Sequence, residues 1–207
     1  MNFKLSGRHL KAALDQVAKR DRDVKRGLRE VGYPKERRSG GPSYDHLLRI
    51  IVGQQISVKA AASVYAKLEA ALGRVEPKRF LALSDAELRA QGLSRQKIAY
   101  GRGLSEAVAA RRLVPKRLAT LPDEEVLAAI TALNGFGRWS AEMFLLFSLG
   151  RPDVWPATDL GIQGGLKKLK NLRVRPSPER ADKIALPWRP YRGAMAVFVW
   201  HYYAKAP

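Results

Sequence analysis

Apolar side chains recur every three to four residues along most of this sequence, and no stretch alternates apolar with polar residues as a half-buried strand would. Helix-start signals fit the same pattern. A capping box opens a short helix at Ser84, Ser94 can cap a longer helix from Arg95 to about Ala110, and Ser177 precedes a proline at a first helical position. We therefore predict an all-α protein of roughly ten helices joined by short connections. The Gly/Pro/Ser-rich stretch 33–42 is the best linker candidate.

Charge narrows the choice of partner. The 207 residues include 38 Lys and Arg against 19 Asp and Glu, a net charge of +19. The excess of positive charge is most simply explained by a polyanionic partner, because binding to Lys and Arg releases the counterions condensed on the polyanion. Nucleic acid is the first candidate. The chain has no cysteine and three histidines. These counts exclude disulfides, cysteine-ligated zinc and a cysteine-held iron–sulfur cluster, and they predict no metal centre.

The sequence offers little for a membrane. Its longest apolar runs are only a few residues, whereas a membrane-spanning helix needs about 20. The first residues do not lead into the apolar segment of a signal peptide. We therefore expect a protein that has no membrane partner and works inside the cell, in the cytoplasm and on the nucleoid if the organism is bacterial.

The segment LNGFGRWSA, residues 133–141, lies between two helical patterns at 123–132 and 138–149. Gly135 and Gly137 flank one apolar residue, which allows a tight turn whose backbone N–H groups point outward at a helix start. Such groups can bind a phosphate oxygen without reading base sequence. An αα-hairpin whose glycines merely permit the turn is an equally good interpretation of this spacing alone.

Asp159 follows a proline-rich loop and precedes an expected helix start capped by Thr158. It is the only acid between Asp153 and Glu179, and five cationic residues follow it by position 175. The Asp159 carboxylate would repel the phosphates that the surrounding basic surface attracts, so helix capping alone does not explain why an acid stands there. Cleavage of an N-glycosidic bond supplies a reason, since its oxocarbenium-like state gains positive charge that a carboxylate stabilises. Helix capping alone is the competing interpretation.

These two segments resemble the helix-hairpin-helix/Gly-Pro-Asp superfamily of DNA glycosylases, and within it the branch that removes alkylated bases, DNA-3-methyladenine glycosylase II. Further motifs match in the expected order, so that the resemblance spans about 44 to 200. They are IVGQQISVKAA at 51–61, GLSRQK at 92–97 and WRPYR at 188–192.

The resemblance implies a two-lobed, all-α glycosylase core within 1–207. One lobe would be about 44–150, with a wedge loop and the hairpin, and the other would combine 1–43 with 151–207. Double-stranded DNA would lie across the cleft between the lobes, bound by a monomer. The enzyme would flip alkylated bases such as 3-methyladenine or 7-methylguanine out of the duplex and hydrolyse their N-glycosidic bond. No cofactor is implied, except that a monovalent cation could be held by the hairpin carbonyls.

The resemblance also implies the residues of the active site. Asp159 would be the catalytic carboxylate. Trp139 would form an aromatic wall of the base pocket, and Trp200 would stack on the flipped base. Met143 and Leu160 stand at pocket positions where a bacterial relative carries tyrosines, so this pocket would be less aromatic.

Other positions would bind DNA. Gln54 and Gln55 fall where the family keeps the residue that wedges into the duplex, and the sequence does not choose between them. The hairpin carries Asn134 where the family usually has proline, which should loosen the turn slightly. The implied DNA-binding residues are Gln54, Gln55, Gly135, Phe136, Gly137, Arg138 and Lys167.

Trp139 occupies the position at which bifunctional members of the superfamily place a lysine that forms a Schiff base with the sugar. Its presence predicts a monofunctional enzyme that leaves an abasic site. Two alternatives stay open. One is a non-enzymatic helix-hairpin-helix DNA-binding module, which needs the glycines and basic faces but not Asp159. The other is an enzyme of this fold that acts on another lesion, such as hypoxanthine, ethenoadenine or uracil.

Overall fold

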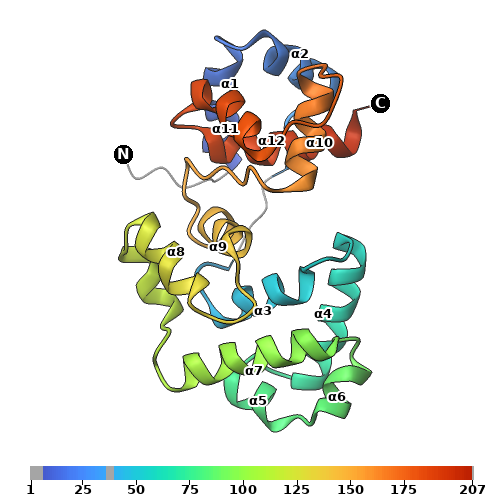
Figure 1. Cartoon of the computed structure of the whole chain (residues 1–207), viewed down its shortest axis with the longest axis vertical. Helices are drawn as coiled ribbons and strands as arrows, with labels where there is room; N and C mark the ends of the chain where they lie inside the picture. Colours follow the sequence, from blue (N-terminus) through green and yellow to red (C-terminus); the bar gives the residue numbers. More distant parts are fainter. Residues whose placement is uncertain (1–6, 36–39, 207) are drawn as a thin grey trace. The chain divides into compact units, whose positions relative to one another are not determined.

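The computed structural model of the protein describes residues 7–35 and 40–206. These ranges contain twelve α-helices and three short helical turns, and no β-strand occurs in them (Figure 1). The all-α prediction is therefore confirmed. Among the same residues, no helix combines the length and the apolar character needed to cross a membrane.

The chain divides into two compact units. The first, here called the hairpin unit, is Ser39–Phe144, and the second, the carboxylate unit, combines Met1–Arg38 with Leu145–Pro207. Of the linker candidate 33–42, residues 36–39 lie outside the described part of the chain.

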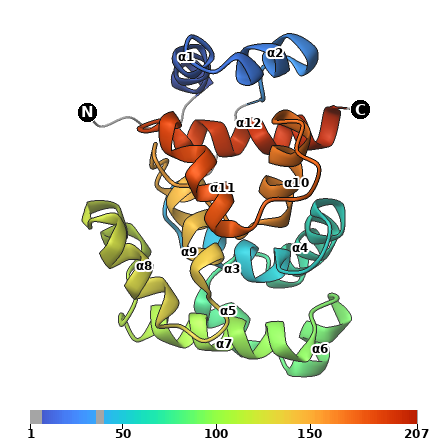
Figure 2. The ribbon, with the colours of Figure 1, turned by 45° about the horizontal axis from the view of Figure 1, so that its top comes forward.

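The hairpin unit is organised around α3, which packs against α4, α7 and α9 (Figure 2). Leu47, Leu48 and Ile51 of α3 are fully buried, and their helical spacing places them on one face of that helix. The helical elements of this unit are α3 (Tyr44–Gly53), α4 (Val58–Leu72), α5 (Pro77–Ala82), α6 (Asp85–Ala90), α7 (Arg95–Ala109), the 3-10 turn η1 (Pro115–Thr120), α8 (Asp123–Thr131) and α9 (Arg138–Met143).

The carboxylate unit is built on the close packing of α10 against α12 (Figure 1). Glycines make this approach possible, because a Cβ on Gly165 would lie 2.5 Å from the carbonyl oxygen of Val199. A Cβ on Gly164 would lie 2.6 Å from the ring of Tyr203. The helical elements that begin in this unit are α1 (Gly7–Ala18), α2 (Arg22–Val31), α10 (Leu160–Leu169), α11 (Pro178–Ala185), the 3-10 turn η3 (Leu186–Trp188) and α12 (Arg192–Lys205).

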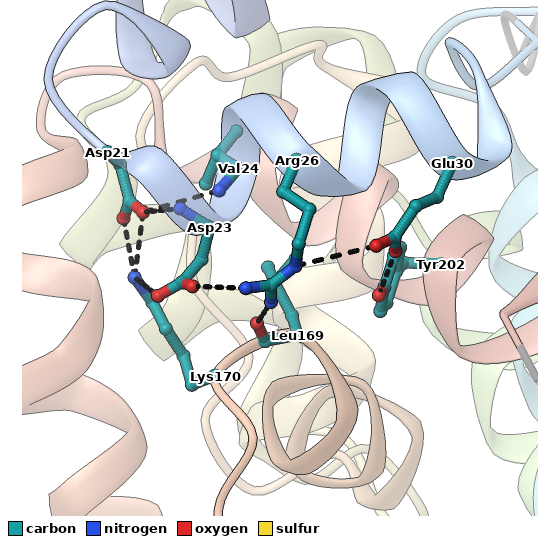
Figure 3. Close-up of polar contacts among 8 residues, drawn as sticks. All are labelled: Asp21, Asp23, Val24, Arg26, Glu30, Leu169, Lys170 and Tyr202. Carbon is teal, nitrogen blue, oxygen red and sulfur yellow. Dashed lines mark hydrogen bonds and ion pairs between the residues drawn. The ribbon is translucent and has the colours of Figure 1, made fainter.

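Charged side chains join α2 to the C-terminal end of α10 (Figure 3). The Lys170 ammonium lies 2.8 Å from both carboxylate oxygens of Asp21 and 3.1 Å from Asp23. Arg26 donates a hydrogen bond of 2.6 Å to the carbonyl oxygen of Leu169. The last turn of α10 is thus held by cations, which also suit the negative end of the helix dipole.

Serine N-caps form where the sequence predicts them, at Ser84, Ser94 and Ser177. The helix expected over 138–149 differs from the prediction. Its α-helical part, α9, ends at Met143, and the chain continues as a π-helical turn, η2 (Phe144–Ser148). A π turn contains more residues per turn than an α-helix, so it redirects the side chains that follow it. The apolar run in this segment fits either geometry, which is why its spacing did not reveal the change.

Candidate active site and hairpin

Asp159 is the N-cap residue of α10. Its Oδ1 atom accepts two hydrogen bonds of 2.8 Å, one from the backbone N–H of Ile162 and one from the indole N–H of Trp200. The prediction that Thr158 caps this helix is wrong: Thr158 lies one residue before the cap and is exposed. Aspartate at this position caps the helix and also complements the positive end of its dipole. Asp159 therefore does cap α10, and the same carboxylate also accepts a hydrogen bond from Trp200 of α12.

Trp200 lies beside this carboxylate, and two contacts hold its ring: the hydrogen bond to Asp159 at its edge and a stacking contact on its face. The indole stacks on Phe147, with ring centroids 5.8 Å apart and planes inclined by 30°. Gly161 leaves the space that the contact needs, because a Cβ there would lie 3.0 Å from both Asp159 Oδ1 and Trp200 Cδ1. Leu160, the pocket residue expected on the first turn of α10, is 64% exposed and adds an apolar side chain next to Asp159.

The hairpin between α8 and α9 depends on its two glycines for different reasons. Gly135 has a φ of +88°, and a Cβ there would lie 2.2 Å from the ring of Tyr100, so only glycine fits. Gly137 is the N-cap of α9, and a Cβ on it would meet no atom of the described residues within 4 Å. Phe136 between them is only 4% exposed, so the turn offers a ligand the flanking residues more than Phe136 itself.

Arg138 opens α9 with a largely exposed side chain that forms an ion pair of 2.9 Å with Glu142. Glu142 is buried, so this acid fixes one end of the guanidinium while the rest faces solvent. Trp139, the next residue, is half-buried, and Met143 at the end of α9 is buried.

A cavity of about 680 Å³ lies within the hairpin unit, between the hairpin, the loop after α3 and the start of α7. Trp139 lines it together with both glycines of the hairpin and with Gln54 and Gln55. The structure therefore brings together the predicted DNA-binding residues of this unit at one cavity, except Arg138, which does not line it. Asp159, Leu160 and Trp200 form their own group in the carboxylate unit.

Gln54 and Gln55 differ sharply in their surroundings. The Gln54 side-chain amide donates to the carbonyl oxygen of Gly135 at 2.8 Å and to Ser140 Oγ at 3.2 Å. Gln55 is exposed and has a φ of +58°, a conformation that L-residues adopt rarely. The first glutamine is thus tied to the hairpin, and the second projects from the loop.

Several site residues could not be found by sequence reasoning. Phe147 and Tyr100 contact the site through packing with residues distant in the chain. Lys97 belongs to the GLSRQK motif and donates a hydrogen bond of 2.8 Å to the carbonyl of Val52, and burial lowers the pKa of its amine. Gly161 did leave a signal, because glycine is a poor choice for a first helical turn unless space is needed there.

Lys167 is exposed in the last turn of α10, at the opposite end of that helix from Asp159. A cation there is favoured by the helix dipole. Within 7–35 and 40–206, no three His, Cys, Asp or Glu side chains are grouped so as to hold a metal ion.

Known proteins resemble this chain over most of its length. Residues 48–190 match the family model described as HhH-GPD superfamily base excision DNA repair protein. DNA-3-methyladenine glycosylase 1 of Schizosaccharomyces pombe is 31% identical over 186 residues, which cover 87% of this chain and 82% of that protein. The solved structure of an S. pombe 3-methyladenine DNA glycosylase in complex with abasic DNA has a TM-score of 0.86 at 30% identity, covering 91% of this chain and 95% of that one. A DNA-3-methyladenine glycosidase from Bacillus halodurans has a TM-score of 0.75 at 30% identity, covering 98% of this chain and 92% of the other.

Proposed function

This chain belongs to the HhH-GPD superfamily of base excision DNA repair proteins, and we propose that it is a monofunctional DNA glycosylase that removes alkylated purines and leaves an abasic site. The names of the S. pombe and B. halodurans proteins support 3-methyladenine as a substrate. One observation carries the proposal: the Asp159 carboxylate is held at the N-terminus of α10 by the N–H groups of Ile162 and Trp200.

Hydrolysis of an N-glycosidic bond builds positive charge on the sugar as the bond electrons leave with the base. A carboxylate already fixed in place stabilises that charge without reorganising during the reaction. Water then adds at the sugar carbon and loses a proton. A purine alkylated at a ring nitrogen is cationic while attached to the sugar and leaves as a neutral base. It therefore needs no general acid, and one aspartate suffices.

Base recognition is assigned to the two tryptophans. Trp139 lines the cavity of the hairpin unit, and Trp200 lies against Asp159 in the carboxylate unit. An indole face attracts a cationic base by about 1–2 kcal/mol through cation–π interaction, and a normal neutral base gains less. Leu160, exposed next to Asp159, would add an apolar contact for the base in the carboxylate unit.

DNA binding is assigned to the hairpin and to the loop after α3. Exposed Gly137 lets a backbone phosphate approach the start of α9. Gln55 is the wedge, because it projects from the loop, whereas the Gln54 amide is engaged by the hairpin. A monovalent cation on the hairpin would share the Gly135 carbonyl oxygen with the Gln54 amide, which one lone pair of that oxygen still permits.

Base release from methylated DNA tests the activity. We expect free 3-methyladenine or 7-methylguanine, followed by alkali-sensitive abasic sites. A non-enzymatic DNA-binding module would bind the same DNA and release nothing. Duplexes with a single hypoxanthine, ethenoadenine or uracil would show whether another lesion is the better substrate.

Borohydride trapping tests the absence of lyase activity. The wild-type protein should give no covalent protein–DNA adduct, because Trp139 offers no amine to the sugar. Trp139→Lys provides a matched control, since it places an amine at the position that bifunctional relatives use. An adduct with the wild-type protein contradicts the monofunctional assignment.

A further inference from the structure

We propose that Trp200 is a positioning residue whose indole N–H fixes the orientation of the Asp159 carboxylate. This role is separate from stacking on a flipped base, and it rests on the proposed function of Asp159. The ring N–H lies in the plane of the indole, whereas stacking uses its face. One tryptophan can therefore serve both purposes.

The hydrogen-bond geometry constrains the carboxylate from two helices at once. Oδ1 of Asp159 accepts from Ile162 N in α10 and from Trp200 Nε1 in α12, each at 2.8 Å. A single donor would leave the carboxylate free to turn about the axis of that hydrogen bond. Two donors from different directions fix the carboxylate plane, and with it the position of Oδ2. Both bonds involve an ionised acceptor, which makes them stronger than neutral hydrogen bonds.

Packing holds the indole in the orientation that this bond requires. Phe147 stacks on the ring with its centroid 5.8 Å away, a common distance for a stabilising aromatic pair. Gly161 leaves just enough room for the indole edge, because a Cβ would come within 3.0 Å of Trp200 Cδ1. Gly165 brings the backbone of α12 close to α10 through its approach to Val199. The N–H is therefore aimed at Asp159 by contacts on both sides.

The chemical consequence lies in the transition state. A carboxylate stabilises the developing sugar cation only if it is already placed, and misplacement by about 1 Å can cost roughly 100-fold in rate. We expect Trp200→Phe, which keeps an aromatic face and removes the donor, to slow single-turnover excision by about 10-fold or more.

Binding of two abasic-site analogues separates positioning from base stacking. One duplex carries a pyrrolidine ring, whose protonated nitrogen mimics the sugar cation, and the other carries a neutral tetrahydrofuran ring. Neither contains a base at the lesion, so stacking on a base cannot affect the comparison. The ratio of the two affinities reports the interaction of Asp159 with positive charge at the sugar.

For Trp200→Phe we expect this affinity ratio to fall by about 10-fold, with tetrahydrofuran binding unchanged. The matched control is Trp188→Phe, which removes an equivalent 2.8 Å indole hydrogen bond to another aspartate, Asp21. That control should keep the wild-type ratio. An unchanged ratio in Trp200→Phe overturns the positioning role.

Two further variants distinguish failure of the positioning role of Trp200 from failure of the proposed function of Asp159. Asp159→Asn should abolish the preference for the cationic analogue, and a wild-type ratio in this variant would refute the proposed function itself. If Trp200→Phe does not fold, the affinity ratio of Gly161→Ala tests the positioning role instead. Its methyl group improves helix propensity but crowds both Asp159 Oδ1 and Trp200 Cδ1. A lowered ratio in a stable Gly161→Ala protein supports the role, and a wild-type ratio rejects it.

Discussion

The side-chain amide of Gln54 donates a 2.8 Å hydrogen bond to the carbonyl oxygen of Gly135, 81 residues further along the chain. The same nitrogen reaches Ser140 Oγ at 3.2 Å. The loop after α3 and the hairpin before α9 are therefore held as one piece. This contact also separates two adjacent glutamines into a structural residue and an exposed one.

Alanine substitutions at these two positions should have opposite effects. Gln54→Ala leaves a partly buried carbonyl without its donor, so the free energy of unfolding should fall by about 1 kcal/mol. Gln55→Ala should change stability by less than about 0.5 kcal/mol, while weakening lesion binding and excision because the duplex would lose the proposed wedge. Urea denaturation and single-turnover excision measure the two effects. Loss of excision in a fully stable Gln54→Ala protein, with Gln55→Ala unaffected, would reverse the assignment.

Asp159→Asn should separate binding from chemistry. Asparagine also caps helices well, so α10 should form and DNA binding should persist. Base release should fall by about 100-fold or more, because the sugar cation loses its countercharge. Fluorescence anisotropy and single-turnover base release are the measurements. Full activity in this variant would remove the catalytic role of the carboxylate.

The two hairpin glycines form a matched pair. Gly135→Ala should destabilise the protein, because it places a methyl group against the Tyr100 ring in a left-handed backbone conformation. Gly137→Ala should keep the fold, since its methyl group has space among the described residues. We expect it to weaken DNA binding all the same, because the methyl group stands where a phosphate would approach. Equal affinity of Gly137→Ala and the wild type for DNA counts against phosphate binding at the hairpin.

Ion pairing at Asp21 gives a prediction about acid stability. Burial alone would raise the pKa of Asp21, but hydrogen bonds from Lys170 and Trp188 outweigh it and lower the pKa below its usual value. A carboxyl group with a lowered folded-state pKa stabilises the fold above its unfolded pKa of about 3.9, and this contribution is lost as the pH falls. Asp21→Asn should thus cost about 2 kcal/mol at pH 7 and progressively less below pH 4. A cost that does not change with pH in urea denaturation would exclude the ion pair as its source.

Salt should weaken DNA binding steeply. Each phosphate contact contributes about −0.9 to the slope of log affinity against log salt concentration. If the exposed amine of Lys167 at the end of α10 binds a phosphate, Lys167→Ala should make that slope less negative by about 0.9, the contribution of one contact. An identical slope in this variant would place Lys167 outside the DNA interface.

Sequence reasoning succeeded where the signals are local. Serine caps and helical spacing predicted the all-α fold, and short motifs along the chain predicted the family. It failed at Thr158, because two adjacent residues are both good N-caps and only the path of the preceding loop decides between them. It also missed the π turn after Met143, since an apolar run does not encode the number of residues per turn.

Contacts between distant segments were beyond sequence reasoning for a different reason. Nothing in two neighbouring glutamines indicates that one of them reaches Gly135. Likewise, a stacking role for Trp200 concerns the face of its ring and does not indicate which group its N–H binds. The structure directs that N–H to Asp159. Tertiary packing decides such hydrogen bonds, and local propensity does not.

The glycines of α10 have a consequence for how the carboxylate unit folds. Gly161, Gly164 and Gly165 each cost roughly 1 kcal/mol of intrinsic helix stability, within a helix of only ten residues. Such a segment would not be helical in isolation, so α10 exists because α12 packs against it. The two helices should therefore open together as one cooperative unit, with matching protection of their amides from hydrogen exchange. The placement of the Asp159 carboxylate is then a property of that pair of helices, and it is lost whenever α12 detaches, even though Asp159 itself is unchanged.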